Sequence, residues 1–119
     1  MTTQNDRLAS TPESGSRAAC VAATTANITL SGLQTVDTVV LAAGDRVLVK
    51  DQTDGTEDGV YIVSTTDWSR AKDWNASDDL QSGILIPVGA GATNLGLWQV
   101  TYSGAFVLGT TEPTITQLA

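Results

Sequence analysis

The stretch that most constrains the fold is residues 44–63, GDRVLVKDQTDGTEDGVYIV, in which two short apolar runs flank a polar loop. The first run has three apolar residues in succession from Val47, and the second, residues 60–63, is β-branched and aromatic throughout. Both compositions favour strand over helix. A helix would need apolar residues every three or four positions across residues 51–59, and this interval contains none. The stretch therefore predicts a β-hairpin whose first arm covers residues 45–50.

Length and charge limit what this sequence can do. At 119 residues the chain has the size of a single domain. Its formal net charge of −7 opposes the phosphate attraction on which nucleic-acid binding depends, so we expect no nucleic-acid partner. No stretch is long and apolar enough to cross a bilayer, and residues 1–17 lack the apolar core of a signal peptide. We therefore expect a soluble protein that is made in the cytoplasm and does not enter a membrane.

The rest of the chain reads as short strands separated by turn residues. A period of two, or a β-branched and aromatic composition, predicts strands at residues 27–31, 36–41, 68–71, 84–88, 97–102 and 105–108, and the tail adds an edge strand. Pro87 cannot donate a hydrogen bond to a ladder, which places it at a sheet edge or a strand end. The interval 72–83 is the least β-like, with one helical turn or a loop as alternatives. This pattern predicts an all-β domain, a compact antiparallel sandwich or barrel.

The N-terminal residues 1–17 differ from this pattern, because they are polar and carry no periodic apolar face. We interpret them as an extended arm before a single β domain at residues 18–119. Two states of the arm stay open, a disordered leader and a segment that orders only on a partner. If the arm is an attachment element, its candidate contact residues are Arg7, Leu8 and Arg17.

Residues suited to catalysis or metal binding are scarce. The sequence contains no histidine, the side chain most used for acid–base chemistry near neutral pH and a common metal ligand. The single cysteine, Cys20, stands among small apolar residues and is predicted to be a buried hydrophobe rather than a reactive thiol. Carboxylates crowd the hairpin loop at intervals that do not match a calcium-binding loop, so we interpret this loop as a solvated turn. These carboxylates belong to Asp51, Asp54, Glu57 and Asp58.

Two further patterns are too incomplete to indicate an enzyme. Asp73, Asp78 and Asp79 lie near a tryptophan, but glycosidase carboxyls must face each other at a defined separation, which proximity in sequence does not establish. Residues 89–96, GAGATNLG, lack both the lysine of a P-loop and the glycine spacing of a dinucleotide site. We therefore expect a non-enzymatic protein with no catalytic residue, no metal and no cofactor.

Trp74 is the aromatic residue most open to a binding role. It follows Lys72 and Asp73 in the polar interval, whereas Trp68 and Trp98 lie in predicted strands. Three interpretations stay open for Trp74: a plug that closes the sheet from a loop, an anchor in a subunit interface, or a platform that stacks on a glycan. Lys72 and Asp73 are the candidate neighbours in either binding role.

The sequence resembles a module that recurs in tail-fibre, tail-spike and related virion proteins of tailed bacteriophages. The resemblance is carried by AATTANITLSGLQTVDTVVLAAGDRVLVKDQTDGTEDGVYIV and the Trp-Ser-Arg-Ala segment that follows. In those proteins a threonine- and leucine-rich opening also leads to a GDRVLVK strand, a polar loop and a GVY or GIY strand. The match covers roughly residues 22–71 and continues loosely to Trp98.

This resemblance implies a non-enzymatic, β-rich building block of the virion that works as a homo-oligomer, with a trimer favoured, beside other virion proteins. We therefore expect a small component or adaptor of the tail or fibre apparatus, involved in assembly and host attachment and located in the virion. Two alternatives stay open. One is a capsid decoration or head-fibre protein, and the other is a carbohydrate-binding module that would use Trp74 on a host surface glycan.

Overall fold

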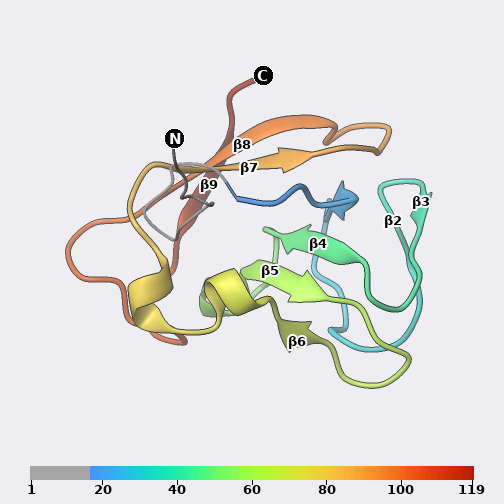
Figure 1. The fold of residues 1–119 in the computed structure, drawn as a ribbon, viewed down its shortest axis with the longest axis horizontal. Helices are drawn as coiled ribbons and strands as arrows, with labels where there is room; N and C mark the ends of the chain where they lie inside the picture. The colour runs from blue at the N-terminus through green and yellow to red at the C-terminus, as the bar shows by residue number, and fades with distance from the viewer. Residues whose placement is uncertain (1–16) are drawn as a thin grey trace, which may run out of the picture.

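The computed structural model describes residues 17–119 and has an all-β fold, as the sequence predicts (Figure 1). Within these residues there is no α-helix, only short 3-10 turns. The strands are β1 (Ala22–Ala23), β2 (Thr35–Val36), β3 (Val39–Val40), β4 (Arg46–Val49), β5 (Gly59–Ile62), β6 (Ser69–Arg70), β7 (Ile84–Val88), β8 (Gly96–Thr101) and β9 (Thr114–Gln117). The 3-10 turns are η2 (Gly55–Glu57), η3 (Lys72–Trp74) and η4 (Ser77–Asp79). None of the helical turns in the described part of the chain is long and apolar enough to span a membrane.

The strands form three sheets. One has the order β1-β4-β5-β6, the second is the β2-β3 hairpin, and the third has the order β7-β8-β9. In the ribbon the β7-β8-β9 sheet lies above β4, β5 and β6, and the β2-β3 hairpin projects at the side (Figure 1). All neighbouring strands are antiparallel except β1, which runs parallel to β4.

The predicted central hairpin is confirmed as β4 and β5, with Val47 opposite Tyr61 and Leu48 opposite Val60. Its sequence is apolar at consecutive positions because both faces of this pair of strands are covered. Leu48 and Val60 belong to a core cluster that also contains the inward residues of β7 and β8. Val47 and Tyr61 belong to a second cluster on the opposite face. The hairpin is therefore the middle layer of the fold.

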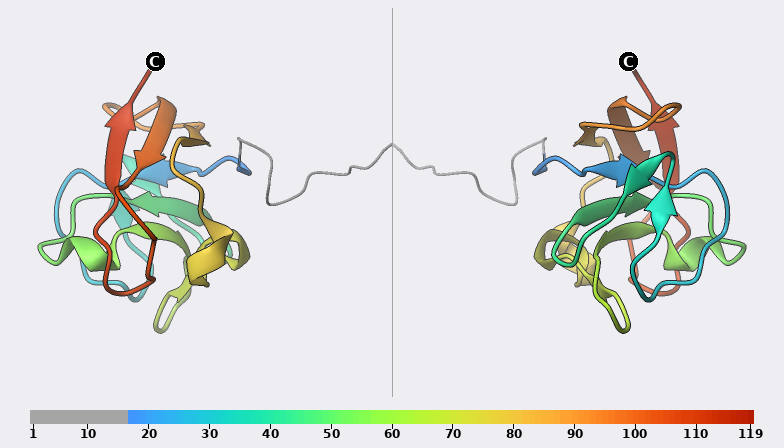
Figure 2. Two further views of the ribbon diagram at one scale, coloured as in Figure 1. Left: turned by 90° about the vertical axis from the view of Figure 1, so that its left-hand side faces the viewer. Right: turned by 90° about the vertical axis from the view of Figure 1, so that its right-hand side faces the viewer.

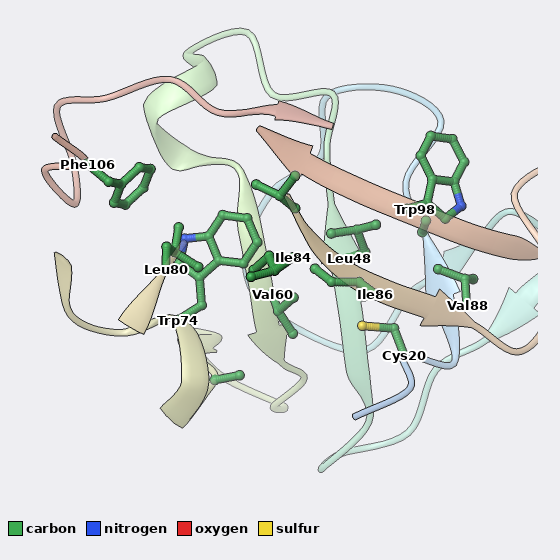
Figure 3. Close-up of a cluster of buried hydrophobic side chains, with 13 residues drawn as sticks. Cys20, Leu48, Val60, Trp74, Leu80, Ile84, Ile86, Val88, Trp98 and Phe106 are labelled. Carbon is green, nitrogen blue, oxygen red and sulfur yellow. The ribbon is translucent and has the colours of Figure 1, made fainter. Parts of the chain in front are cut away.

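The first cluster fills the space between the β7-β8-β9 sheet and the central hairpin (Figure 3). On β7 the alternate residues Ile84, Ile86 and Val88 point into it, and on β8 Trp98 and Val100 do so. Trp74 enters the same cluster from η3, outside the strands. The alternation in β7 and β8 therefore reflects one buried and one more exposed face.

The segment 17–24 joins the two larger sheets. Its first half pairs with β7, where the N–H of Cys20 donates to the C=O of Pro87 at 2.8 Å. Its second half pairs with β4, where the N–H of Thr24 donates to the C=O of Leu48 at 3.0 Å. The backbone groups of Pro87 thus point to this segment and away from β8. That direction explains why the ladder between β7 and β8 tolerates a residue with no N–H.

Further strand predictions are confirmed with small shifts: residues 68–71 supply β6, residues 84–88 supply β7, residues 97–102 supply most of β8, and the tail supplies the edge strand β9. The prediction for residues 36–41 is wrong in kind, because this run folds back on itself as β2 and β3. The reversal occurs at Asp37 and Thr38, whose φ angles are 47° and 70°.

Two predicted strands do not form. Residues 27–31 alternate because Ile28 and Leu30 pack against the second cluster, but their main chain makes only an isolated bridge, between Ser31 and Asp67. Residues 105–108 end in a turn, in which the N–H groups of Thr110 and Thr111 both donate to the C=O of Val107.

Candidate functional site: the anchor of the N-terminal segment

Four residues, Arg17, Arg46, Asp73 and Asp79, make charged or polar contacts where the described chain begins, and we call this group the anchor. Arg46 on β4 donates from Nη1 to Oδ1 and from Nη2 to Oδ2 of Asp73, at 2.9 and 2.8 Å. The guanidinium also donates through Nε to the C=O of Ala18 at 3.0 Å. Such bidentate, charge-assisted pairs fix both the distance between the two groups and their orientation.

Arg17 adds the second cation of the anchor. Its main-chain N–H donates to the C=O of Leu85 on β7 at 2.9 Å, and its Nη2 donates to the C=O of Asp79 at 2.6 Å. Its Nε lies 3.9 Å from Oδ2 of Asp73, and the side chain is only 5% exposed. Arg17, which the sequence analysis placed in the arm, is therefore fixed to the β domain. The other two arm candidates, Arg7 and Leu8, lie outside the described residues.

Cys20 lies beside the anchor and is 1% exposed. Burial raises the pKa of its thiol to about 12, and this effect outweighs the opposing attraction of the Arg46 guanidinium. The thiolate is the nucleophilic form of cysteine, so this side chain is unreactive near neutral pH. The sequence interpretation of Cys20 as a buried small hydrophobe agrees with this position.

The three residues singled out around η3 have different surroundings. Lys72 is exposed, Asp73 belongs to the anchor, and Trp74 is 1% exposed. The Trp74 ring meets Phe106 edge to face, with centroids 6.5 Å apart (Figure 3). Its Nε1 is buried without a hydrogen-bond partner in the described part of the chain. Of the three interpretations of Trp74, the plug fits this packing, and a stacking platform would need a face of the ring that is not accessible here.

The carboxylates of the hairpin loop do not converge. Asp51 accepts from Lys50 and from the Thr24 hydroxyl, whereas Asp54 accepts from Thr56 at the start of η2. Across residues 17–119 no three acidic, cysteine or histidine side chains come together in a group that could hold a metal ion. The loop therefore uses its carboxylates one by one, as hydrogen-bond acceptors that shape the turn.

Asp58 departs from the solvated turn that we expected in this loop. The residue is 6% exposed, and its Oδ1 accepts the main-chain N–H of Gln52 at 2.9 Å. Burial raises its pKa to about 6, assisted by the negative charges of Asp51 and Glu112. The sequence offered no signal for this, because Asp58 stands in a run of polar residues and glycines that are typical of turns.

Sequence reasoning also missed Asp37, at the tip of the β2-β3 hairpin. Its carboxylate accepts the main-chain N–H groups of Thr93 and Asn94, and the latter bond measures 2.8 Å. These hydrogen bonds hold the pKa of Asp37 below its ordinary value, with the bond from Asn94 as the largest cause. The main-chain N–H groups that the glycine-rich loop 89–96 offers at Thr93 and Asn94 are thus bound by a carboxylate of the same chain. The one signal in the sequence was an aspartate between β-branched residues, since aspartate tolerates a positive φ.

Comparison of the chain with protein families, with curated proteins and with solved structures finds no match. The anchor is built of charged side chains that bind one another and main-chain carbonyl groups, and beside it lie an unreactive thiol and a buried indole. What this arrangement does chemically is to hold the segment at residues 17–20 against β4, β7 and the 3-10 turns.

Proposed function

We propose that this chain is a structural protein of a bacteriophage virion, a small component or adaptor of the tail or fibre apparatus involved in assembly and host attachment. The observation that carries the proposal is the resemblance of residues 22–71 to the module found in tail-fibre and tail-spike proteins. Its role is non-enzymatic and its location is the virion. It acts beside other virion proteins as a homo-oligomer, and a trimer is the state that the resemblance implies.

The position of the resembling residues supports a scaffold role. The apolar side chains of the GDRVLVK and GVYIV runs are buried or half-buried, and they belong to the two core clusters on either face of the central hairpin. Their sequence is therefore constrained by packing on both faces. We also propose that the two larger sheets form a β-sandwich, because the first cluster lies between them. In this proposal the attachment contacts are made by the surface of the β domain and by residues 1–16.

The anchor supports an adaptor role. Arg17 and Arg46 fix the end of the N-terminal segment to β4, β7 and the η3–η4 turns through partly or fully buried contacts. A force applied through this segment would reach the core of the domain directly. An element that links two parts of a particle needs such a connection.

The capsid decoration or head-fibre role is the alternative within the virion. Electron microscopy of particles that lack this gene product separates the two roles. Loss of density from the tail or its fibres supports the proposal. Loss of density from the capsid surface, with tails intact, supports the alternative and contradicts the proposal.

The carbohydrate-binding alternative receives no support from the tryptophans. Trp68, Trp74 and Trp98 are 7%, 1% and 6% exposed, so none of them offers an open ring face to a sugar. A glycan array that shows specific binding by the purified protein would revive this alternative. If that binding survived Trp74→Ala, the contact would have to lie elsewhere on the surface.

A further inference from the structure

Within residues 17–119 the edge strand β9 pairs on one side only, with β8. Leu97 on β8 directs both of its main-chain groups to β9, since its N–H donates to Ala119 and its C=O accepts from Leu118. The direction of these groups alternates along a strand, so Gln99 and Thr101 also face β9. They lie opposite Thr116 and Thr114. The main-chain groups of the intervening residues 115 and 117 therefore point away from β8, along the free edge.

Nothing in the described part of the chain covers this edge. No hydrogen bond within residues 17–119 reaches the outward N–H or C=O of Ile115 or Gln117 from the side away from β8. In the side view β9 is the outermost strand of its sheet (Figure 2, left). Two unpaired donors and two unpaired acceptors thus stand in a row, which is the usual template for strand addition.

Features at both ends of this free edge limit how many residues can pair with an added strand. By the same alternation, the main-chain groups of Pro113 point to the same side as those of Ile115 and Gln117, but proline has no N–H to donate. At the other end the N–H groups of Leu118 and Ala119 both donate to the C=O of Leu97, which is the pattern of a β-bulge. Only residues 115 and 117 can therefore pair fully with an added strand.

The charge distribution favours a second copy as the added strand. Glu112 is the only charged residue in the sequence from 80 to 119, although the chain carries a net charge of −7. Two copies therefore repel each other over most of their surfaces, whereas the strand at residues 114–117 carries no charge at all. The exposed side chains of Thr114 and Thr116 are neutral and β-branched, and such pairs stabilise neighbouring strands.

We propose that β9 pairs antiparallel with β9 of a second copy, about a two-fold axis that passes beside Thr116. In this register Ile115 lies opposite Gln117 of the second copy, and Gln117 lies opposite its Ile115. Each of these two pairs exchanges both N–H···O=C bonds, so every unpaired main-chain group of residues 115 and 117 acquires a partner. A register centred on Ile115 would instead place Gln117 opposite Pro113, which lacks the N–H.

This inference does not depend on the virion role. Two-fold pairing closes on itself at two copies, and it joins the three-stranded sheets of both into one of six strands. A three-fold contact, which the resemblance implies, would use another surface of the chain. Failure of the β9 contact therefore leaves the proposed function standing, and detection of the contact in the purified protein does not by itself establish that function.

Cysteine cross-linking tests the register. The two Thr116 residues would form a non-hydrogen-bonded pair with Cα atoms about 4.5 Å apart, which lies in the range that a disulfide spans. The Thr116→Cys protein is oxidised at high concentration, alkylated and analysed on a non-reducing gel. The native Cys20 is 1% exposed and does not compete. We expect a disulfide-linked dimer that a reducing agent removes.

Thr114→Cys is the matched control, because it introduces the same side chain on the same face of the same strand. In the proposed register Thr114 lies opposite Leu118 of the second copy, and the two Thr114 Cα atoms are about 13 Å apart along the strands. A disulfide cannot bridge that separation. We expect the control to stay at the background level, and equal cross-linking of the two variants would overturn the register.

Gln117→Pro tests the pairing without a cross-link. It removes an outward N–H and leaves the ladder between β8 and β9 intact, because the N–H of Gln117 is not part of that ladder. Sedimentation over a range of concentrations should show dimer formation by the unmodified protein and its loss in Gln117→Pro. Unchanged self-association in Gln117→Pro, or an unmodified protein that stays monomeric while Thr116→Cys fails to cross-link, would overturn the proposal.

Discussion

Arg46 on β4 and Asp73 in η3 form a two-pronged ion pair, with N···O distances of 2.9 and 2.8 Å. The pair joins the middle layer of the fold to the turn that carries Trp74. The Arg46 side chain is 16% exposed and that of Asp73 is 32% exposed, so the contact is partly shielded from water. It is therefore expected to contribute more than an ordinary surface ion pair.

Replacing Asp73 by Asn should lower the free energy of unfolding by about 1–2 kcal/mol, because a charge-assisted pair becomes a weaker neutral contact. The measurement is urea denaturation followed by tryptophan fluorescence. Asp78→Asn is the matched control, since it removes the same charge at an exposed position in the nearby turn η4. Equal effects of the two substitutions would show that net charge, and not the pair, is responsible.

The tryptophans give a second prediction, because their indole nitrogens differ. Nε1 of Trp98 donates to the C=O of Asn94 and Nε1 of Trp68 donates to the C=O of Gly32, both at 2.9 Å. Nε1 of Trp74, by contrast, has no hydrogen-bond partner among residues 17–119. Substitution by Phe should therefore cost about 1 kcal/mol more at Trp98 and Trp68 than at Trp74. Thermal or urea unfolding of the three variants measures this difference, and the largest loss at Trp74 would contradict it.

Replacement of Thr38 by glycine is expected to stabilise the protein. The φ of Thr38, 70°, lies in the left-handed region, where a β-branched side chain is strained. Thr38→Gly should raise the free energy of unfolding by about 1 kcal/mol, because the relief of strain exceeds the entropy that glycine costs. Thr35→Gly on the neighbouring strand β2 is the control and should be destabilising. A loss of stability in Thr38→Gly would mean that the hairpin tip is not strained.

Asp58 predicts a specific pH dependence. Burial raises its pKa from 3.8 to about 6, although the N–H of Gln52 and the charge of Lys50 act in the opposite direction. The folded state therefore binds the proton more tightly than the unfolded state, and this contribution to stability is complete below pH 3.8. It is lost as the pH rises to about 6.

Asp58→Asn tests this assignment, because asparagine keeps an acceptor for Gln52 but does not ionise. The difference in unfolding free energy between the unmodified protein and the variant should change between pH 4 and pH 7, in favour of the variant at the higher pH. Asp37 and Asp54 titrate below their ordinary pKa values and are common to both proteins, so they cancel in the difference. A difference that stays constant over this range would refute the assignment.

Sequence reasoning succeeded where local pattern and burial agree. The hairpin of β4 and β5 was predictable because three successive apolar residues and a β-branched run favour strand over helix. In the structure both faces of this pair of strands are covered. The alternation of Ile84, Ile86 and Val88 identified β7 for the same reason. In these segments the side chains that set the period are the ones that fill the core.

Sequence reasoning failed where side chains from distant positions replace a neighbouring strand as hydrogen-bond partners. Ile28 has strand-like alternation, but the side chain of Gln52 donates to its C=O and accepts from its N–H, both at 3.0 Å. One amide group thus takes the place of a neighbouring strand. Asp37 similarly turns the chain back at a sequence with no glycine, because the N–H groups of Thr93 and Asn94 hold its carboxylate. Such contacts join positions far apart in the chain, so the local sequence does not identify the partner.

The anchor was beyond prediction for the same reason. Arg17, Arg46 and Asp73 were visible as charged residues, but their meeting depends on segment 17–24 running from β7 to β4. Trp74 stood out in the sequence because it lies outside the predicted strands, and the structure places it in η3. The ring enters the core, which fits the plug among the three interpretations that the sequence left open.

Purified particles allow a test of whether this chain is a structural component of the tail or fibre apparatus of a virion. Immunogold electron microscopy of purified particles, with an antibody raised against the isolated protein, tests it most directly. Gold particles on the tail or its fibres are the predicted result. Particles that carry no gold, and whose protein content yields no peptide of this chain by mass spectrometry, would contradict the claim.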